Sequence, residues 1–195
     1  PLAGGRAYPV EMFVCGDSKR TLEMLADRLK NRFVPDKSFT KDILVAQQRA
    51  EREVRDALGP YDGIVDAVID AVPRDFVWVR DITLSNTIWG NRLPLLDGPR
   101  DGVHALGGGI GQGLPMGIGA ALGVQEEGRK TLVLIGDGGF AVTLGEFATA
   151  KQENADIVII LMNDGGYGVI KNIADAHFGG RRAYVDILGP DWGKL

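Results

Sequence analysis

Two apolar runs in this sequence are each followed by an acidic residue within a glycine-rich turn. The run at 131–135 precedes Gly-Asp-Gly-Gly, which contains Asp137, and the run at 157–162 precedes Asn-Asp-Gly-Gly, which contains Asp164. In an open parallel sheet, ligands bind outside the carboxyl ends of the strands. Two carboxylates at that edge could hold a divalent cation against phosphates, as Mg²⁺ is commonly held. The pattern therefore favours a metal-bridged diphosphate.

The first of these turns has a second interpretation. Residues 136–141 read GDGGFA and fit the G-x-G-x-x-G/A pattern of a Rossmann dinucleotide site. Asp137 would repel a bare pyrophosphate, whereas a cation between carboxylate and phosphate makes the same residue favourable. Turn aspartates also cap helices or close Asx turns without binding a ligand. An NAD-dependent oxidoreductase and a non-catalytic binding module therefore remain as alternatives.

The segments that must position these turns alternate between strand and helix patterns. Strands are expected over residues 76–79, 131–135 and 157–162, and helices over 64–72, 111–124, 143–153 and about 169–177. This alternation is typical of βαβ units, so we predict an α/β fold, a three-layer α/β/α arrangement around a parallel sheet. Uninterrupted apolar strands indicate a sheet that is covered on both faces.

The first 60 residues have a different composition from the rest. They contain 4 of the 28 glycines and 20 charged residues. Asp17 or Ser18 can cap a helix with an apolar face over 22–29. Residues 31–42 are polar, contain Pro35 and are predicted to be a linker, and a charged amphipathic helix is expected over 44–58.

The overall composition excludes several classes of protein. Of 195 residues, 45% are hydrophobic and the net charge is −4, which argues against nucleic-acid binding. The longest apolar run, 157–162, is too short to span a membrane. Cys15 is the single cysteine, so no disulfide framework is expected. We expect a cytoplasmic protein with no nucleic-acid or membrane partner.

The spacing of the two turns resembles a known motif. Gly-Asp-Gly at 136–138, then 24 residues, then Asn163-Asp164 is similar to the thiamin-diphosphate motif GDG-x(24–27)-NN. Residues 108–115 resemble the G-x-hydrophobic-G-x-G-L-P stretch of acetolactate synthases and benzoylformate decarboxylases, and residues 7–29 look like the tail of their central domain. The resemblance implies two parts: 1–42, the end of a central domain and a linker, and 43–195, a C-terminally incomplete diphosphate-binding domain.

The resemblance also implies a set of site residues. The metal, Mg²⁺, would be held by Asp137, by Asp164 where the usual residue is Asn, and by the backbone oxygen of Gly166. Ile110 would support the bent cofactor from beneath, and the carbonyl of Gly108 would accept a hydrogen bond from its aminopyrimidine. The full set of cofactor-binding residues is Thr83, Ser85, Gly108, Gly109, Ile110, Asp137, Gly138, Gly139, Asp164, Gly166, Tyr167, Gly168 and Val169.

The activity that the resemblance implies is decarboxylation of a small 2-oxo acid, carboligation of the resulting enamine, or both. Ile170 stands where pyruvate decarboxylases carry a Glu, and Ile173 where acetolactate synthases usually carry a Trp. The family's catalytic Glu lies in an N-terminal domain of a partner subunit, so we expect no catalytic residue within this chain and a homodimer or tetramer. Lys171 and Asn172 are expected on a solvated helix surface, with a substrate channel as the alternative, and His104 is expected in a loop, with the substrate side of the cofactor as the alternative.

Overall fold

The computed structural model describes residues 9–32, 34 and 36–195, and the chain divides into two compact units, 1–48 and 49–195. Parts of the predicted central-domain tail and linker, residues 1–8, Phe33 and Pro35, lie outside the described residues. Helix α1 (Ser18–Leu29) in the first unit begins where Asp17 accepts a hydrogen bond from the Arg20 amide at 2.9 Å.

Helix α2 (Lys37–Asp56) begins in the first unit and ends in the second. Its start shows that the linker prediction for 31–42 was wrong from residue 37 onward. The Asp36 carboxylate accepts a hydrogen bond from the Ser38 amide at 2.8 Å, which satisfies one of the free amides of a helix start. The expected helix over 44–58 is therefore the later part of a longer one.

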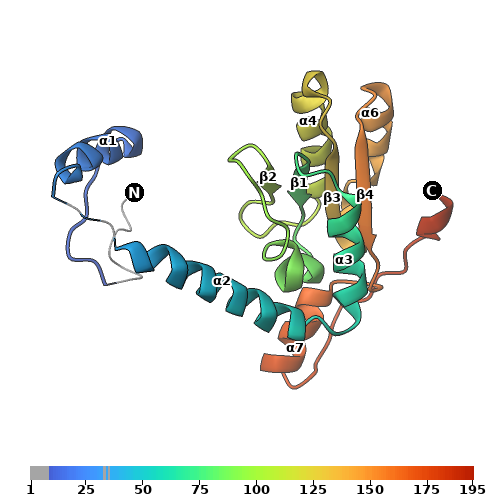
Figure 1. Ribbon diagram of the computed structural model, residues 1–195. Coiled ribbons are helices and arrows are strands. Elements are labelled where there is room, and N and C mark those ends of the chain that lie inside the picture. The colour runs from blue at the N-terminus through green and yellow to red at the C-terminus, as the bar shows by residue number, and fades with distance from the viewer. Residues whose placement is uncertain (1–8, 33, 35) are drawn as a thin grey trace. The chain divides into compact units, whose positions relative to one another are not determined.

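Four parallel strands form the sheet of the second unit (Figure 1). They are β1 (Val77–Arg80), β2 (Gly102–His104), β3 (Thr131–Gly136) and β4 (Ile157–Met162), in the order β2-β1-β3-β4. Val79 lies opposite Val133, which lies opposite Ile159. The predicted parallel α/β sheet is confirmed. Strand β2 was not predicted, since three residues beginning with glycine carry no periodic signal.

The helices of the second unit are α3 (Asp62–Ala71), α4 (Gly113–Val124), α5 (Asp137–Val142), α6 (Phe147–Gln152) and α7 (Gly168–His177). A 3₁₀ turn over Leu144–Glu146 separates α5 from α6 within the helix predicted over 143–153. A π-helical turn over Asn86–Gly90 follows β1. Further 3₁₀ turns lie at Gly59–Tyr61, Gln125–Glu127 and Trp192–Lys194.

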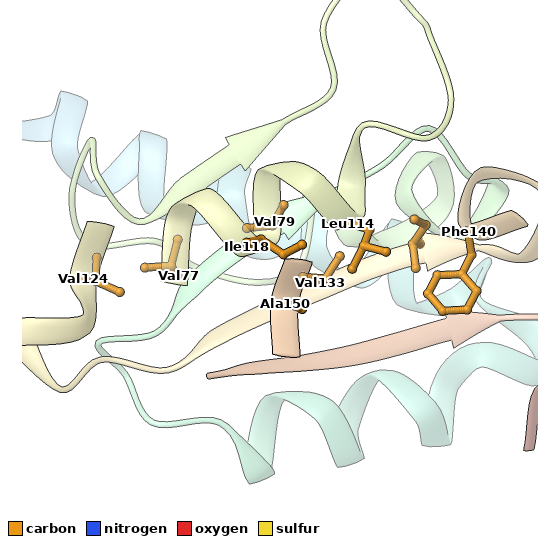
Figure 2. Close-up of a cluster of buried hydrophobic side chains, with 9 residues drawn as sticks. Val77, Val79, Leu114, Ile118, Val124, Val133, Phe140 and Ala150 are labelled. Carbon is orange, nitrogen blue, oxygen red and sulfur yellow. The ribbon is translucent and has the colours of Figure 1, made fainter. Parts of the chain in front are cut away.

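The side chains of the strands alternate between two buried clusters. Figure 2 shows Val77, Val79 and Val133 packed against Leu114 and Ile118 of α4. On the opposite face, Trp78, Leu132 and Leu134 pack with Val65 of α3 and Trp89 of the π-helical turn. Helices thus cover both faces, which confirms the three-layer α/β/α prediction.

Strand β4 is less buried than its apolar sequence predicts. Val158 is 51% exposed, and the other residues of β4 are half-buried. The reason is its position at the end of the strand order, where it pairs with β3. Within the part of the chain that the structure describes, no helix has the length and apolar character needed to cross a membrane.

Candidate metal and diphosphate site

Three aspartates lie at the carboxyl edge of the sheet. Asp81 directly follows β1, Asp137 directly follows β3, and Asp164 follows β4 after one asparagine. The sequence pattern predicted Asp137 and Asp164 as site residues but not Asp81. The signal that could have revealed it is the same one, an acid at the end of an apolar run, but no glycine turn surrounds Asp81 to draw attention to it.

Asp137 joins the two glycine-rich turns. Its side chain is buried, with Oδ1 accepting a hydrogen bond from the Gly138 amide at 2.9 Å and Oδ2 accepting one from the Gly166 amide at 3.0 Å. Because amides are neutral donors, they orient the carboxylate without cancelling its charge. Each oxygen retains a lone pair for a cation.

Asp164 lies beside Asp137 and is exposed. Burial, and after it the negative charge of Asp137, raise the pKa of the Asp164 carboxyl, while Lys171 opposes the rise. No ion pair from Lys, Arg or His to either aspartate is found among the described residues. A cation between the two carboxylates would relieve their repulsion, so the pair fits a divalent metal.

The metal would need further oxygen ligands. In the described ranges, no cluster of three or more His, Cys, Asp or Glu side chains is placed to hold an ion. Two carboxylates completed by backbone and phosphate oxygens are a common arrangement for Mg²⁺. The donor set therefore fits magnesium on a phosphorylated ligand better than an all-protein metal cage.

A strap of chain at residues 185–187 holds the second turn. Gly166 forms an antiparallel bridge with Asp186, the Tyr167 amide donates to the Val185 carbonyl at 2.8 Å, and the Ile187 amide donates to the Gly165 carbonyl at 3.1 Å. A Cβ at Gly166 would lie 2.1 Å from the Val185 oxygen. Only glycine therefore fits this position. The strap was not among the elements predicted from the sequence.

Lys171 also belongs to this arrangement. Its Nζ donates to the Gly165 carbonyl at 3.2 Å and pairs with Asp186 at 2.9 Å, and its side chain is 16% exposed. The expectation of a solvated surface lysine was wrong, because the strap returns over α7 and shields this side chain.

The glycines of the first turn allow close packing from three sides. A Cβ at Gly136 would lie 3.2 Å from Thr83 Oγ1, and one at Gly138 would lie 2.8 Å from the Tyr167 ring. A Cβ at Gly139 would lie 2.9 Å from Asp81 Oδ2. The structure thus brings Thr83 and Tyr167 to the turn.

The remaining candidates lie around these turns. Ser85 is buried two residues beyond Thr83, and Gly168 packs so closely on Asp164 that a Cβ there would lie 2.0 Å from its Oδ2. Val169 is half-buried in the first turn of α7. Thus the residues chosen from 83–85 and from 164–169 flank the same carboxyl edge.

The glycine-rich loop at 106–112 approaches the first turn through its last residues. Gly111 lies beside Gly139, since a Cβ on Gly139 would be 3.3 Å from the Gly111 nitrogen. Ile110 is half-buried, whereas Gly108 and Gly109 are exposed.

Gln112 holds this loop closed. Its Nε2 donates to the carbonyls of Leu106 and Gly109 at 2.9 and 2.8 Å, and its Oε1 accepts from the Leu106 amide at 3.1 Å. Gln112 was not among the residues predicted from the sequence. His104, expected in a loop, is the last residue of β2 and is exposed.

The fold and these turns define an α/β domain with its glycine-rich turns and acids at the carboxyl edge of a parallel sheet. The family model described as "Thiamine pyrophosphate enzyme, C-terminal TPP binding domain" matches residues 85–195. The chain belongs to this family, whose cofactor is also called thiamin diphosphate.

Two curated relatives are similar to much of the chain. The protein named Probable 2-ketoarginine decarboxylase of Pseudomonas aeruginosa is 37% identical in an alignment of 175 positions that covers 85% of this chain and 29% of the relative. The acetolactate synthase isozyme 1 large subunit of Escherichia coli is 34% identical over 116 residues, 59% of this chain and 20% of the relative. The chain thus spans less than a third of the length of either relative.

Solved structures share the fold. A benzoylformate decarboxylase from Polynucleobacter necessarius has a TM-score of 0.61 at 22% identity, over 68% of this chain and 25% of that one. A thiamine diphosphate-dependent 4-hydroxybenzoylformate decarboxylase from Rhodococcus jostii has a TM-score of 0.57 at 27% identity, over 64% of this chain and 23% of that one.

Proposed function

We propose that the protein carrying this chain uses thiamin diphosphate and Mg²⁺ to decarboxylate a small 2-oxo acid, to ligate the product to a second carbonyl compound, or both. The observation that carries the proposal is the Asp137–Asp164 pair, two adjacent carboxylates that form no ion pair with Lys, Arg or His in the described part of the chain. Family membership names the cofactor's class, and the relatives include proteins named decarboxylase and synthase.

In this proposal the chain binds and orients the cofactor. Asp137, Asp164 and the Gly166 carbonyl hold the magnesium ion, and the turn at Gly138 and Gly139, against which Tyr167 and Asp81 pack, contacts the diphosphate. Ile110 supports the cofactor from beneath, and the Gly108 carbonyl accepts from its aminopyrimidine. When bound, thiamin diphosphate supplies the electron sink for cleaving the bond to the carboxylate.

The remaining predicted contacts line the same edge. Thr83 and Ser85 face the diphosphate from the segment after β1, and the segment 167–169 closes the site from the start of α7. The catalytic Glu is proposed to come from another domain of a partner subunit, which makes the active protein a homodimer or tetramer. A cytoplasmic location is part of the same proposal.

Two earlier alternatives are weaker. An NAD-dependent oxidoreductase is not retained, because the matched family binds thiamine pyrophosphate and because Asp137 would repel a bare pyrophosphate. A non-catalytic module would bind the cofactor without turnover. An assay series distinguishes this module from the proposed enzyme, because only the enzyme should release carbon dioxide from a 2-oxo acid.

The central test measures thiamin diphosphate binding by calorimetry on the full-length protein, with Mg²⁺ and with EDTA. We expect binding only with the metal, and a loss of at least about 100-fold in affinity for Asp137→Ala, because the variant lacks the acceptor for two turn amides and one metal ligand. The control is Asp156→Asn, an exposed acid before β4. Metal-independent binding, or unchanged affinity in Asp137→Ala, contradicts the proposal.

The substrate class is tested with a panel of 2-oxo acids. Steady-state carbon dioxide release with 2-ketoarginine, benzoylformate and pyruvate would rank the candidates, and analysis of the products would separate simple decarboxylation from carboligation. No release from any 2-oxo acid, despite metal-dependent cofactor binding, would favour the non-catalytic module.

A further inference from the structure

Asp81 is a fully buried acid whose two oxygens both accept backbone hydrogen bonds. Its Oδ1 accepts from the Ile82 amide at 2.6 Å, and its Oδ2 accepts from the amides of Gly111 and Gly113 at 3.0 and 2.9 Å. The two glycines lie 30 and 32 positions further along the chain. Asp81 therefore connects the end of β1 to the end of the glycine-rich loop and the start of α4.

Only a carboxylate satisfies this set of partners. All three are donors, and an ionised carboxylate is an acceptor at both oxygens. An asparagine offers one acceptor oxygen, so its NH₂ group would face at least one backbone N–H. Burial makes such an unsatisfied donor costly.

Asp81 fills the space beside two glycines, Gly113 and Gly139. A Cβ at Gly113 would lie 2.8 Å from Asp81 Cβ, and one at Gly139 would lie 2.9 Å from Asp81 Oδ2. The carboxylate thus lies where three pieces of backbone meet: the end of β1, the loop, and the turn at 136–139. Glycine at Gly113 and Gly139 is what allows them to meet.

The two side chains that bind the loop have different effects. The Gln112 side chain bonds to Leu106 and Gly109 of the same loop, so it sets the loop's shape. Asp81 belongs to another segment and sets the loop's place relative to the sheet. At the other end of the loop, the Ala105 amide donates to the Arg80 carbonyl at 3.0 Å.

We propose that Asp81 is a positioning residue, which fixes the loop at 106–112, and with it Ile110, against the diphosphate turn. The role of Ile110 rests on the proposed function, whereas the placement of the loop does not. Asp81 itself contacts backbone amides and acts on the cofactor only through the loop that it holds.

The first test is hydrogen–deuterium exchange with residue-level fragmentation on the cofactor-free, full-length protein. The amides of Gly111 and Gly113 should exchange at least about 100-fold more slowly than those of Gly107 and Gly108, which adopt exposed left-handed conformations. Equal exchange rates would overturn the proposal. This measurement needs no variant, so it decides the matter even if substitution at Asp81 prevents folding.

The second test compares Asp81→Asn with Asp101→Asn, an acid held by Arg129 at the opposite edge of the sheet. We expect Asp81→Asn to speed exchange at Gly111 and Gly113 at least 10-fold and to weaken thiamin diphosphate binding 10- to 100-fold, with binding still dependent on Mg²⁺. Asp101→Asn should leave both unchanged. Unchanged exchange in Asp81→Asn, or the same change in Asp101→Asn, refutes the positioning role.

A double-mutant cycle separates positioning from general stability. At saturating cofactor, the losses of kcat in Asp81→Asn and Ile110→Ala should be non-additive, because both remove the same support. Additive losses would mean that Asp81 acts independently of Ile110. If the wild-type protein binds no thiamin diphosphate, the proposed function fails while the exchange experiments still decide the role of Asp81.

Discussion

The aspartates that directly precede or follow the strands have different hydrogen-bond partners at the two edges of the sheet. At the amino edge, Asp101 precedes β2 and pairs with Arg129, and Asp156 precedes β4 and pairs with Lys130. At the carboxyl edge, Asp81 and Asp137 accept hydrogen bonds from backbone amides. Amides hold a carboxylate in place but leave its charge for a ligand, whereas a lysine or arginine neutralises it.

The pKa directions follow the same division. The hydrogen bond from Arg129 lowers the pKa of the Asp101 carboxyl. Burial and the charge of Asp137 raise the pKa of the Asp164 carboxyl. Asp101 is thus held in an ion pair, whereas Asp137 and Asp164 repel each other and form no ion pair among the described residues, so a cation could bind between them.

The largest expected effect comes from adding one methyl group at the carboxyl edge. Gly166→Ala should destabilise the protein by about 3 kcal/mol, because its Cβ would lie 2.1 Å from a backbone oxygen that cannot move without the strap. The measurement is urea unfolding. The matched control is Gly102→Ala at the amino edge, where the Cβ meets the flexible end of Leu96. Equal losses would remove the distinction between the edges.

The next effect concerns the amino edge. Arg129→Met should destabilise the protein by about 2 kcal/mol, because Arg129 donates to the carbonyls of Asp75 and Phe76 as well as to Asp101. Cofactor affinity should not change, since the substitution lies at the other end of the strands. Urea unfolding measures the stability of the variant, and calorimetry on the folded variant measures its cofactor affinity. A loss of affinity in a folded variant would show that the two edges are coupled.

A smaller and opposite effect is expected for Asp164→Asn without cofactor. The variant should be more stable than the wild type at pH 7, because it removes the repulsion from Asp137. The gain should not exceed about 1 kcal/mol, since Asp164 is exposed and water screens this repulsion. The raised pKa means that the wild-type folded state is less stable at pH values at which Asp164 is ionised.

The pH dependence gives the sign of this effect. The gain in Asp164→Asn should shrink as the pH falls from 7 toward the ordinary carboxyl pKa of 3.8, because the wild-type residue is then protonated. Saturating Mg²⁺ and thiamin diphosphate should also cancel the gain in stability, which thermal unfolding would measure. A variant that is less stable than the wild type without cofactor would contradict the assignment of Asp164 to an unneutralised pair.

The smallest effect is expected at the exposed Lys130–Asp156 pair. Asp156→Asn should change stability by no more than about 0.5 kcal/mol, and 0.5 M salt should reduce even that, because both side chains are more than half exposed. Urea unfolding at two salt concentrations measures it. A change above about 1 kcal/mol would mean that this pair contributes far more than exposed pairs usually do.

Local sequence patterns predicted the central part of the fold well. Strand β4 lies at the predicted 157–162 and β3 extends the predicted 131–135 by one residue, because continuous apolar runs bounded by turns are a strong local signal. Acids directly after such runs must lie at the carboxyl edge. The placement of Asp137 and Asp164 therefore followed from the sequence, although their ligand stays a proposal.

The predictions that were wrong depended on contacts of single side chains. Asp36 starts α2 within a segment whose polar composition and proline indicated a linker. Lys171 is shielded by the strap, and no periodic pattern in the sequence predicts that strap. In each case, a hydrogen bond or a returning segment outweighed the average character of the local residues.

By itself, the sequence determined the class of this domain and the two acids of its candidate site, because strand periodicity and turn spacing are local properties. Only the tertiary structure revealed Asp81 as the residue that joins β1 to a loop 30 positions away, and the strap at 185–187 that requires glycine at Gly166. Such contacts bring together residues that are distant in the chain, and their geometry exists only once the sheet has formed.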